Sequence, residues 1–226
     1  MDDTLKQFLD ILDKEVERYR VPVIDLIGVQ SSDPYRVLIA TILSARTKDE
    51  VTAAATARLF AEAPTVDELR TLSEERIGAL IYPVGFYRSK ARHLRGAAEM
   101  LVERLHGLVP DTLDGLLALP GVGRKTANLV LAVAFNTPAI CVDTHVHRIS
   151  NIWGVVNTAT VLETEMALRE LLPQAYWQEV NRTLVAFGQA ICRPVAPHCD
   201  VCLLTDRCAK IGVTPRRLPP LSAPPQ

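Results

Sequence analysis

Four of the five cysteines in this 226-residue chain lie close together near its C-terminal end. They follow the spacing Cys192-x6-Cys199-x2-Cys202-x5-Cys208. The chain starts with the acidic residues Met1-Asp2-Asp3 and lacks the basic region of a signal peptide, so we expect a reducing compartment in which disulfides are disfavoured. Thiols at this density then favour a metal centre, and a fold that brings all four together.

The spacing also bears on which metal centre is present. A four-cysteine zinc ribbon usually pairs two CxxC knuckles across a longer gap, whereas here only Cys199 and Cys202 form such a knuckle. The pattern therefore favours an iron–sulfur cluster. Four buried cysteines without a ligand are the alternative. The fifth cysteine, Cys141, stands alone and is expected in the core.

Composition gives little indication of a partner. Lys and Arg number 25 against 26 Asp and Glu, a formal net charge of -1, so no overall basic excess points to a nucleic acid. Any anion site must be local, built from helix N-termini and a few cations such as the run Arg88, Lys90, Arg92 and Arg95, which could equally be a solvated helix face. No apolar run approaches the roughly 20 residues of a membrane span, so we expect a cytoplasmic protein.

Apolar residues recur at helical spacing nearly throughout, without strand-like alternation, and this predicts an all-α fold. The sequence places helices along residues 5–16, after the Asp33-Pro34 cap, after the Thr65-x-x-Glu68 capping box, from about Tyr87 to Gly107, around 112–117, from Arg124 to about Phe135, and from near Asp143, Thr160 and Ala175. The proline-rich end from Val213 onward has little to bury and is expected to be disordered.

A glycine-containing turn joins two of these helices in the string Leu119-Pro-Gly-Val-Gly-Arg-Lys-Thr-Ala127. Gly121 and Gly123 allow a sharp turn that exposes backbone N–H groups, and the next helix points its positive end outward. Such a site can hold a phosphate without reading bases. The alternative is an ordinary loop between helices.

Two titratable residues near this turn can carry chemistry. Lys125 lies in the first turn of a helix, where a cation opposes the macrodipole by about 0.3 to 1 kcal/mol, and such a position favours a nucleophilic amine. An exposed or phosphate-binding lysine is the alternative. Asp143 precedes an amphipathic run and reads as a helix N-cap. A capping carboxylate is rigidly placed, so it can also stabilise a cationic sugar or assist proton transfer.

The hairpin, the segment Val142-Asp143-Thr-His145-Val-His-Arg148 and the cysteine spacing together resemble the endonuclease III branch of the helix-hairpin-helix DNA glycosylases. The resemblance implies a two-lobed, all-α fold. Residues 27–137 would form a six-helix lobe with the helix-hairpin-helix at about 112–135, and residues 1–26 with 138–211 an iron–sulfur cluster lobe, leaving 212–226 as a tail. DNA would lie across the cleft between the lobes.

The resemblance also implies roles. Lys125 matches the lysine that forms a Schiff base, Asp143 the catalytic aspartate, and Cys192, Cys199, Cys202 and Cys208 the ligands of a 4Fe-4S cluster. The enzyme would excise damaged bases, expected to be oxidised pyrimidines, from double-stranded DNA and cut the abasic site by β-elimination, as a monomer near the nucleoid. DNA contacts are expected from Gly121, Val122, Gly123, Arg124, His145 and two looser matches, Arg46 and Phe86.

The looser matches raise two questions. Phe86 falls where the family places a side chain that enters the vacated base stack. Arg46 stands where well-known members have a gap-filling glutamine, which leaves lesion preference open. The nearest competitor, an adenine glycosylase, lacks the lysine and has a carboxylate where this chain has Ile42. A non-catalytic iron–sulfur DNA-binding protein is the alternative from another class.

Overall fold

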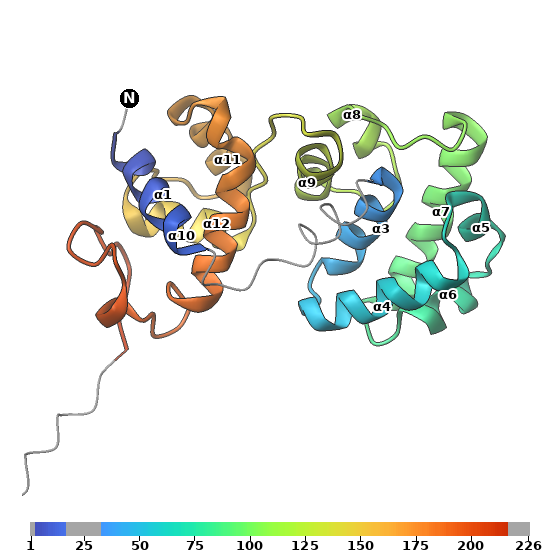
Figure 1. Ribbon diagram of the computed structural model, residues 1–226, viewed down its shortest axis with the longest axis horizontal. Coiled ribbons are helices and arrows are strands. Elements are labelled where there is room, and N and C mark those ends of the chain that lie inside the picture. The colour runs from blue at the N-terminus through green and yellow to red at the C-terminus, as the bar shows by residue number, and fades with distance from the viewer. Residues whose placement is uncertain (1–2, 17–32, 217–226) are drawn as a thin grey trace, which may run out of the picture. The chain divides into compact units, whose positions relative to one another are not determined.

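The computed structural model describes residues 3–16 and 33–216, and this part of the chain contains helices and no strand (Figure 1). The α-helices are α1 (Asp3–Val16), α3 (Pro34–Ser44), α4 (Asp49–Glu62), α5 (Val66–Thr71), α6 (Glu74–Ile81), α7 (Tyr87–Leu105), α8 (Leu113–Leu117), α9 (Arg124–Phe135), α10 (Thr144–Trp153), α11 (Val161–Leu171) and α12 (Trp177–Ala190). Two 3-10 helices, Gln174–Tyr176 and Cys199–Val201, complete the set. The all-α prediction is confirmed.

The described residues group into two compact units. The first unit holds residues 3–16, 142–172 and 183–216, and the second holds 33–141 and 173–182. The grouping differs from the lobes expected from the sequence at residues 138–141 and 173–182, which belong to the second unit. Helix α12 therefore contributes its first turns to the second unit and the rest to the first.

The core of the second unit is built around α3 and α7. Helix α3 is buried along most of its length and packs against α4 and α9, whereas α5 and α6 pack against α7. Its apolar residues, among them Leu38, Leu43 and Ile42, are almost fully buried. Burial of this continuous apolar set stabilises the unit and gives the connecting loops a rigid frame.

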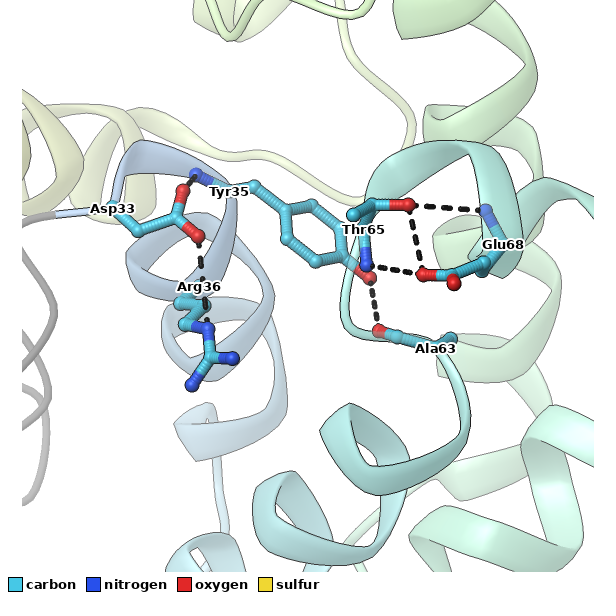
Figure 2. Close-up of polar contacts among 6 residues, drawn as sticks. All are labelled: Asp33, Tyr35, Arg36, Ala63, Thr65 and Glu68. Carbon is cyan, nitrogen blue, oxygen red and sulfur yellow. Dashed lines mark hydrogen bonds and ion pairs between the residues drawn. The ribbon is translucent and has the colours of Figure 1, made fainter.

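Two helix starts in this unit, those of α3 and α5, have the predicted caps (Figure 2). The Asp33 carboxylate accepts a hydrogen bond from the backbone N–H of Tyr35 at 2.9 Å, and the Tyr35 hydroxyl donates to the Ala63 carbonyl at 3.1 Å. Thr65 and Glu68 form a reciprocal capping box. These caps satisfy N–H groups that an α-helix leaves unpaired, and they confirm the helix starts inferred from sequence.

The first unit has a smaller aromatic core. The apolar side of α1 is buried through Leu5, Phe8, Leu9 and Leu12, while the side chain of Val16 lies outside the described residues. The ring of Phe8 meets Trp153 of α10 edge-on at 5.0 Å between centroids, and Trp153 lies 6.2 Å from Phe187 of α12. These rings tie three helices, distant in sequence, into one core.

The start of the proline-rich end contacts residues 197 and 200 through Arg216, and the expectation of disorder from Val213 stays a prediction. The Arg216 guanidinium donates to the Asp200 carboxylate at 2.7 Å, and its backbone N–H donates to the Pro197 carbonyl at 3.1 Å. The rest of the predicted tail, residues 217–226, lies outside the described residues. In the described ranges, no helix has both the length and the apolar character needed to cross a membrane.

Candidate functional site

The glycine turn between α8 and α9 has the predicted hairpin form. Helix α8 is capped by Thr112, and the turn closes with a bond from the Val122 N–H to the Leu119 carbonyl at 3.2 Å. Both apolar side chains are buried, so the hairpin is fastened to the core of the second unit. Gly121 has φ 79°, in the left-handed region that glycine tolerates.

The two glycines of the turn differ in their surroundings. A β-carbon on Gly121 would lie 2.7 Å from Cβ of His93, so this position permits only glycine without rearrangement. Gly123 has no atom within 4 Å of the place its β-carbon would take. It is the N-cap of α9 and supplies no side-chain acceptor to the first turn. A phosphate can therefore approach the positive end of α9 at Gly123.

Lys125 is an exposed residue in the first turn of α9. Its backbone carbonyl accepts a hydrogen bond from the Cys141 thiol at 3.5 Å, and this bond fixes the start of α9. Cys141 is buried, and its own carbonyl accepts from the Asn181 side chain at 3.0 Å. The prediction of a core position for Cys141 is confirmed, and the lysine side chain extends from an anchored helix start.

Asp143 caps α10 in the first unit, as its sequence context predicts. One carboxylate oxygen accepts from the N–H groups of His145 at 2.8 Å and Val146 at 3.0 Å. In the next turn, a terminal guanidinium nitrogen of Arg148 lies 3.4 Å from Nδ1 of His145 and donates to the Cys192 carbonyl at 2.7 Å. Helix α10 thus connects the aspartate cap to the first of the clustered cysteines.

The structure brings together the two looser candidates, Arg46 and Phe86, in the second unit. Both lie in short loops and have left-handed backbone conformations, with φ 54° and 58°, which are unusual for residues with bulky side chains. The guanidinium of Arg46 sits 5.6 Å from the centre of the Phe86 ring, and 64% of Phe86 is exposed. Backbone strain that presents an exposed aromatic side chain is typical of functional loops.

The proposed basic face of α7 needs a correction at Lys90. Arg92 and Arg95 are paired with Glu74 at 3.8 Å and Glu99 at 3.1 Å, whereas Lys90 is only 7% exposed and points into the unit. Its position was predictable in principle, because residues 90, 94, 97 and 101 form one helical stripe whose other members are buried Leu94, Ala97 and Leu101. Sequence reasoning missed this residue because a lysine was assigned to the surface by type.

The four clustered cysteines line a common pocket in the first unit. All four are free thiols, and the pocket wall includes the apolar side chains Ile152, Trp153, Phe187 and Ile191. Burial raises the pKa of the Cys192 thiol to about 12, and the pKa values of Cys202 and Cys208 are also raised, chiefly by burial. Ionising these thiols together therefore requires a compensating positive charge, which a metal centre supplies.

The two candidate metal centres need different arrangements of the four sulfurs. In the described residues, no group of three or more His, Cys, Asp and Glu side chains is placed so that it could hold a metal ion. A tetrahedral zinc would draw four sulfurs to about 2.3 Å from one point. In a 4Fe-4S cluster each cysteine binds a different iron, so the four sulfurs stand apart around a larger body. The four thiols line one pocket, and soft thiolates of this kind suit either centre.

Residues 39–174 match the HhH-GPD superfamily of base excision DNA repair proteins. Endonuclease III of Thermotoga maritima is 50% identical over 179 residues, which are 79% of this chain and 84% of that protein. The chain belongs to the endonuclease III family. The endonuclease III of Synechocystis sp. is 39% identical, with 77% of this chain and 80% of that protein aligned.

Other members are longer, and solved structures share the fold. The endonuclease III-like protein 1 of Bos taurus is 47% identical, but this chain spans only 56% of its length. A non-covalent endonuclease III–DNA complex matches 93% of the chain and 96% of its own, with a TM-score of 0.84 at 34% identity. A trapped covalent endonuclease III–DNA intermediate covers the same shares of the two chains, with a TM-score of 0.83 and 33% sequence identity. The predicted family and its helix-hairpin-helix fold are confirmed.

The candidate residues of this family member are divided between the two units. Lys125, the hairpin, Arg46 and Phe86 lie in the second unit, whereas Asp143, His145 and the four cysteines lie in the first. Ile42, the position at which an adenine glycosylase has a carboxylate, is a buried apolar residue of α3. Helix α3 therefore offers no carboxylate at position 42.

Proposed function

We propose that the chain is a bifunctional DNA glycosylase and abasic-site lyase. The observation that carries the proposal is the exposed Lys125 amine on an anchored helix start, next to the open approach at Gly123. A phosphate held by the hairpin backbone places the adjoining sugar near the amine. Membership of the endonuclease III family supports the same activity.

The proposed reaction starts with the damaged nucleotide flipped out of the stack. The neutral amine of Lys125 attacks C1′, the bond from C1′ to the base breaks, and the base departs with the electron pair and takes up a proton. The attached nitrogen then loses a proton, the bond from C1′ to the ring oxygen O4′ breaks, and O4′ takes up a proton, which opens the sugar and leaves a protonated imine at C1′. This group makes a C2′ proton acidic. Loss of that proton expels the 3′ phosphate from C3′, so the strand is cut without water attacking phosphorus.

Asp143 is proposed as the charged partner in this chemistry. Two backbone N–H groups fix one of its oxygens, so the carboxylate has a single orientation without further reorganisation. An ionised carboxylate stabilises positive charge that develops on the sugar as the base leaves, and it can accept a proton in a later step. Its role as N-cap and its proposed chemical role can therefore coexist in one side chain.

The four clustered cysteines are proposed to hold a 4Fe-4S cluster, whose iron stabilises the thiolates and ties the C-terminal segment together. The DNA contacts are proposed at Arg46, Phe86, His145 and the hairpin residues Gly121 to Arg124. Phe86 would enter the gap left by the flipped base. The expected substrates are oxidised pyrimidines in double-stranded DNA, bound by a monomer in the cytoplasm near the nucleoid.

Borohydride trapping tests this proposal directly. Wild-type protein incubated with abasic-site DNA and borohydride should give a covalent adduct, and Lys125→Gln should give none because an amide forms no imine. The matched control is Lys14→Gln, which removes an exposed amine from α1 and should leave trapping unchanged. DNA binding, measured in parallel, should persist in both variants because hairpin backbone donors hold the phosphates.

The alternatives give different results in this assay and in the same assay run on a lesion-bearing duplex. Trapping by Lys125→Gln at the wild-type level would assign the nucleophile to another amine and overturn the role of Lys125. On a lesion-bearing duplex, a monofunctional glycosylase would release the base without a borohydride adduct, and a non-catalytic binding protein would neither release the base nor form an adduct. A panel of duplexes with different lesions then defines the substrate.

A further inference from the structure

Lys90 makes contacts that a surface lysine of α7 would not make. Its ammonium donates to the Leu43 carbonyl at 2.8 Å, to the Ala45 carbonyl at 2.6 Å and to the Thr47 hydroxyl at 3.3 Å. Burial lowers the pKa of Lys90 to about 8, so at neutral pH the nitrogen still carries three protons, one for each acceptor. Two of these acceptors are carbonyls at the C-terminal end of α3, where the helix leaves its last carbonyls without internal partners.

The acceptors belong to the loop that carries Arg46, and this loop is interlocked with the one that carries Phe86. The Thr47 hydroxyl oxygen, which accepts a hydrogen bond from the Lys90 ammonium, also accepts one from the backbone N–H of Gly85 at 3.2 Å. A β-carbon on Gly85 would lie 2.6 Å from the Arg46 carbonyl, so the two backbones are in direct contact. Lys90 itself starts the first turn of α7 by donating its N–H to the Phe86 carbonyl at 3.0 Å.

We infer that Lys90 is a positioning residue that fixes the Arg46 and Phe86 loops as one rigid element for opening the DNA duplex. The inference deepens the proposed function and rests on it. Both loop residues are held in left-handed conformations that cost energy, and such conformations persist only when their surroundings fix them. The three hydrogen bonds of the Lys90 ammonium supply this constraint from the buried side, while Arg46 and Phe86 stay exposed on the other side.

Substrates that need different amounts of base unstacking separate positioning from simple folding support. Lys90→Met keeps the length of the side chain but removes its three donors. We expect excision of a paired lesion to fall about tenfold, because loosened Arg46 and Phe86 loops no longer hold the base stack open. Cleavage of a pre-formed abasic site should fall less than about threefold, since it needs less unstacking. The fluorescence of 2-aminopurine next to the lesion, which reports unstacking, should lose most of its rise on binding.

Three further variants control the result. Arg104→Met removes an exposed charge from the last turn of the same helix and should change neither rate. Phe86→Ala should reproduce the selective loss, and adding Lys90→Met to it should cause little further loss, because both act through the same wedge. Should Lys90→Met fail to fold, Thr47→Val decides the question, since it removes the oxygen shared by Lys90 and Gly85 and should give the same selective loss to a smaller degree.

The outcomes distinguish this inference from the proposed function. Wild-type protein that neither excises lesions nor cuts abasic sites would overturn the function itself. An active wild type together with equal losses on both substrates in the folded variant, or losses that multiply in the double variant, would overturn the positioning role and leave Lys90 as a structural residue.

Discussion

The hairpin at residues 119–127 and the cysteine segment at 192–216 both carry proposed functional groups, but they are held in place differently. The hairpin has its own buried apolar residues, Leu119, Val122 and Ala127, and lies between two helices. The cysteine segment contains one three-residue 3-10 helix and buries only Cys192, Pro197 and Leu204. Four of its apolar side chains are more than half exposed: Val195, Val201, Leu203 and Ile211.

The difference predicts which side chains can be substituted without loss of the fold. Packing fixes the hairpin without any help from the amine of Lys125, so chemistry there can be removed while the fold remains. The cysteine segment has too little core to order itself, and the proposed cluster replaces the missing hydrophobic contacts. Function should therefore be separable from stability at the hairpin and inseparable from it at the cysteines.

The largest effect is expected from Cys199→Ser. Loss of one ligand should release the cluster and lower the free energy of unfolding of the first unit by more than about 3 kcal/mol, because metal binding contributes directly to folding. Iron and acid-labile sulfide analysis, visible absorbance and thermal unfolding measure the change. Cys141→Ala is the matched control, because this buried cysteine lies outside the cluster and should leave the iron content intact. About one zinc and no iron in the wild type would contradict the cluster.

Asp143→Asn should have the next largest effect, on turnover and not on folding. Asparagine still caps a helix, so the free energy of unfolding should change by less than about 0.5 kcal/mol. Loss of the negative charge should slow base release about 100-fold, measured in single-turnover excision. Asp33→Asn makes the same change at the N-cap of α3 and should leave turnover unchanged. Equal rates in Asp143→Asn and wild type would limit Asp143 to its capping role.

The sequence predicted features that local chemistry determines. The caps at Asp33, Thr65 and Asp143 and the hairpin at Gly121 follow from short-range hydrogen bonding and backbone preference, and all appear in the structure. The cation–π pair of Arg46 and Phe86 joins loops far apart in the chain, and its spacing leaves no local pattern.

Lys90 shows a second limit of the same kind. Its buried place was visible in the helical stripe, but two of its partners are backbone carbonyls at the end of α3, which the residue types there do not indicate. Sequence reasoning therefore finds groups that carry chemistry more readily than groups that hold them in position.

The smallest effect is expected from the glycines of the hairpin, and it tests whether packing alone fixes this region. Gly121→Ala must adopt φ 79° and place a β-carbon against His93, so it should lower the free energy of unfolding by about 1 to 3 kcal/mol. Gly123→Ala has an ordinary φ of -97° and open space, so it should cost less than about 1 kcal/mol. Its methyl group would nevertheless occupy the approach to the start of α9 and weaken binding of abasic-site DNA. Thermal unfolding and binding titrations on both variants should therefore give opposite rankings. Matching losses of stability in the two variants would show that the hairpin depends on both glycines for its fold, and wild-type DNA affinity in Gly123→Ala would place the phosphate elsewhere.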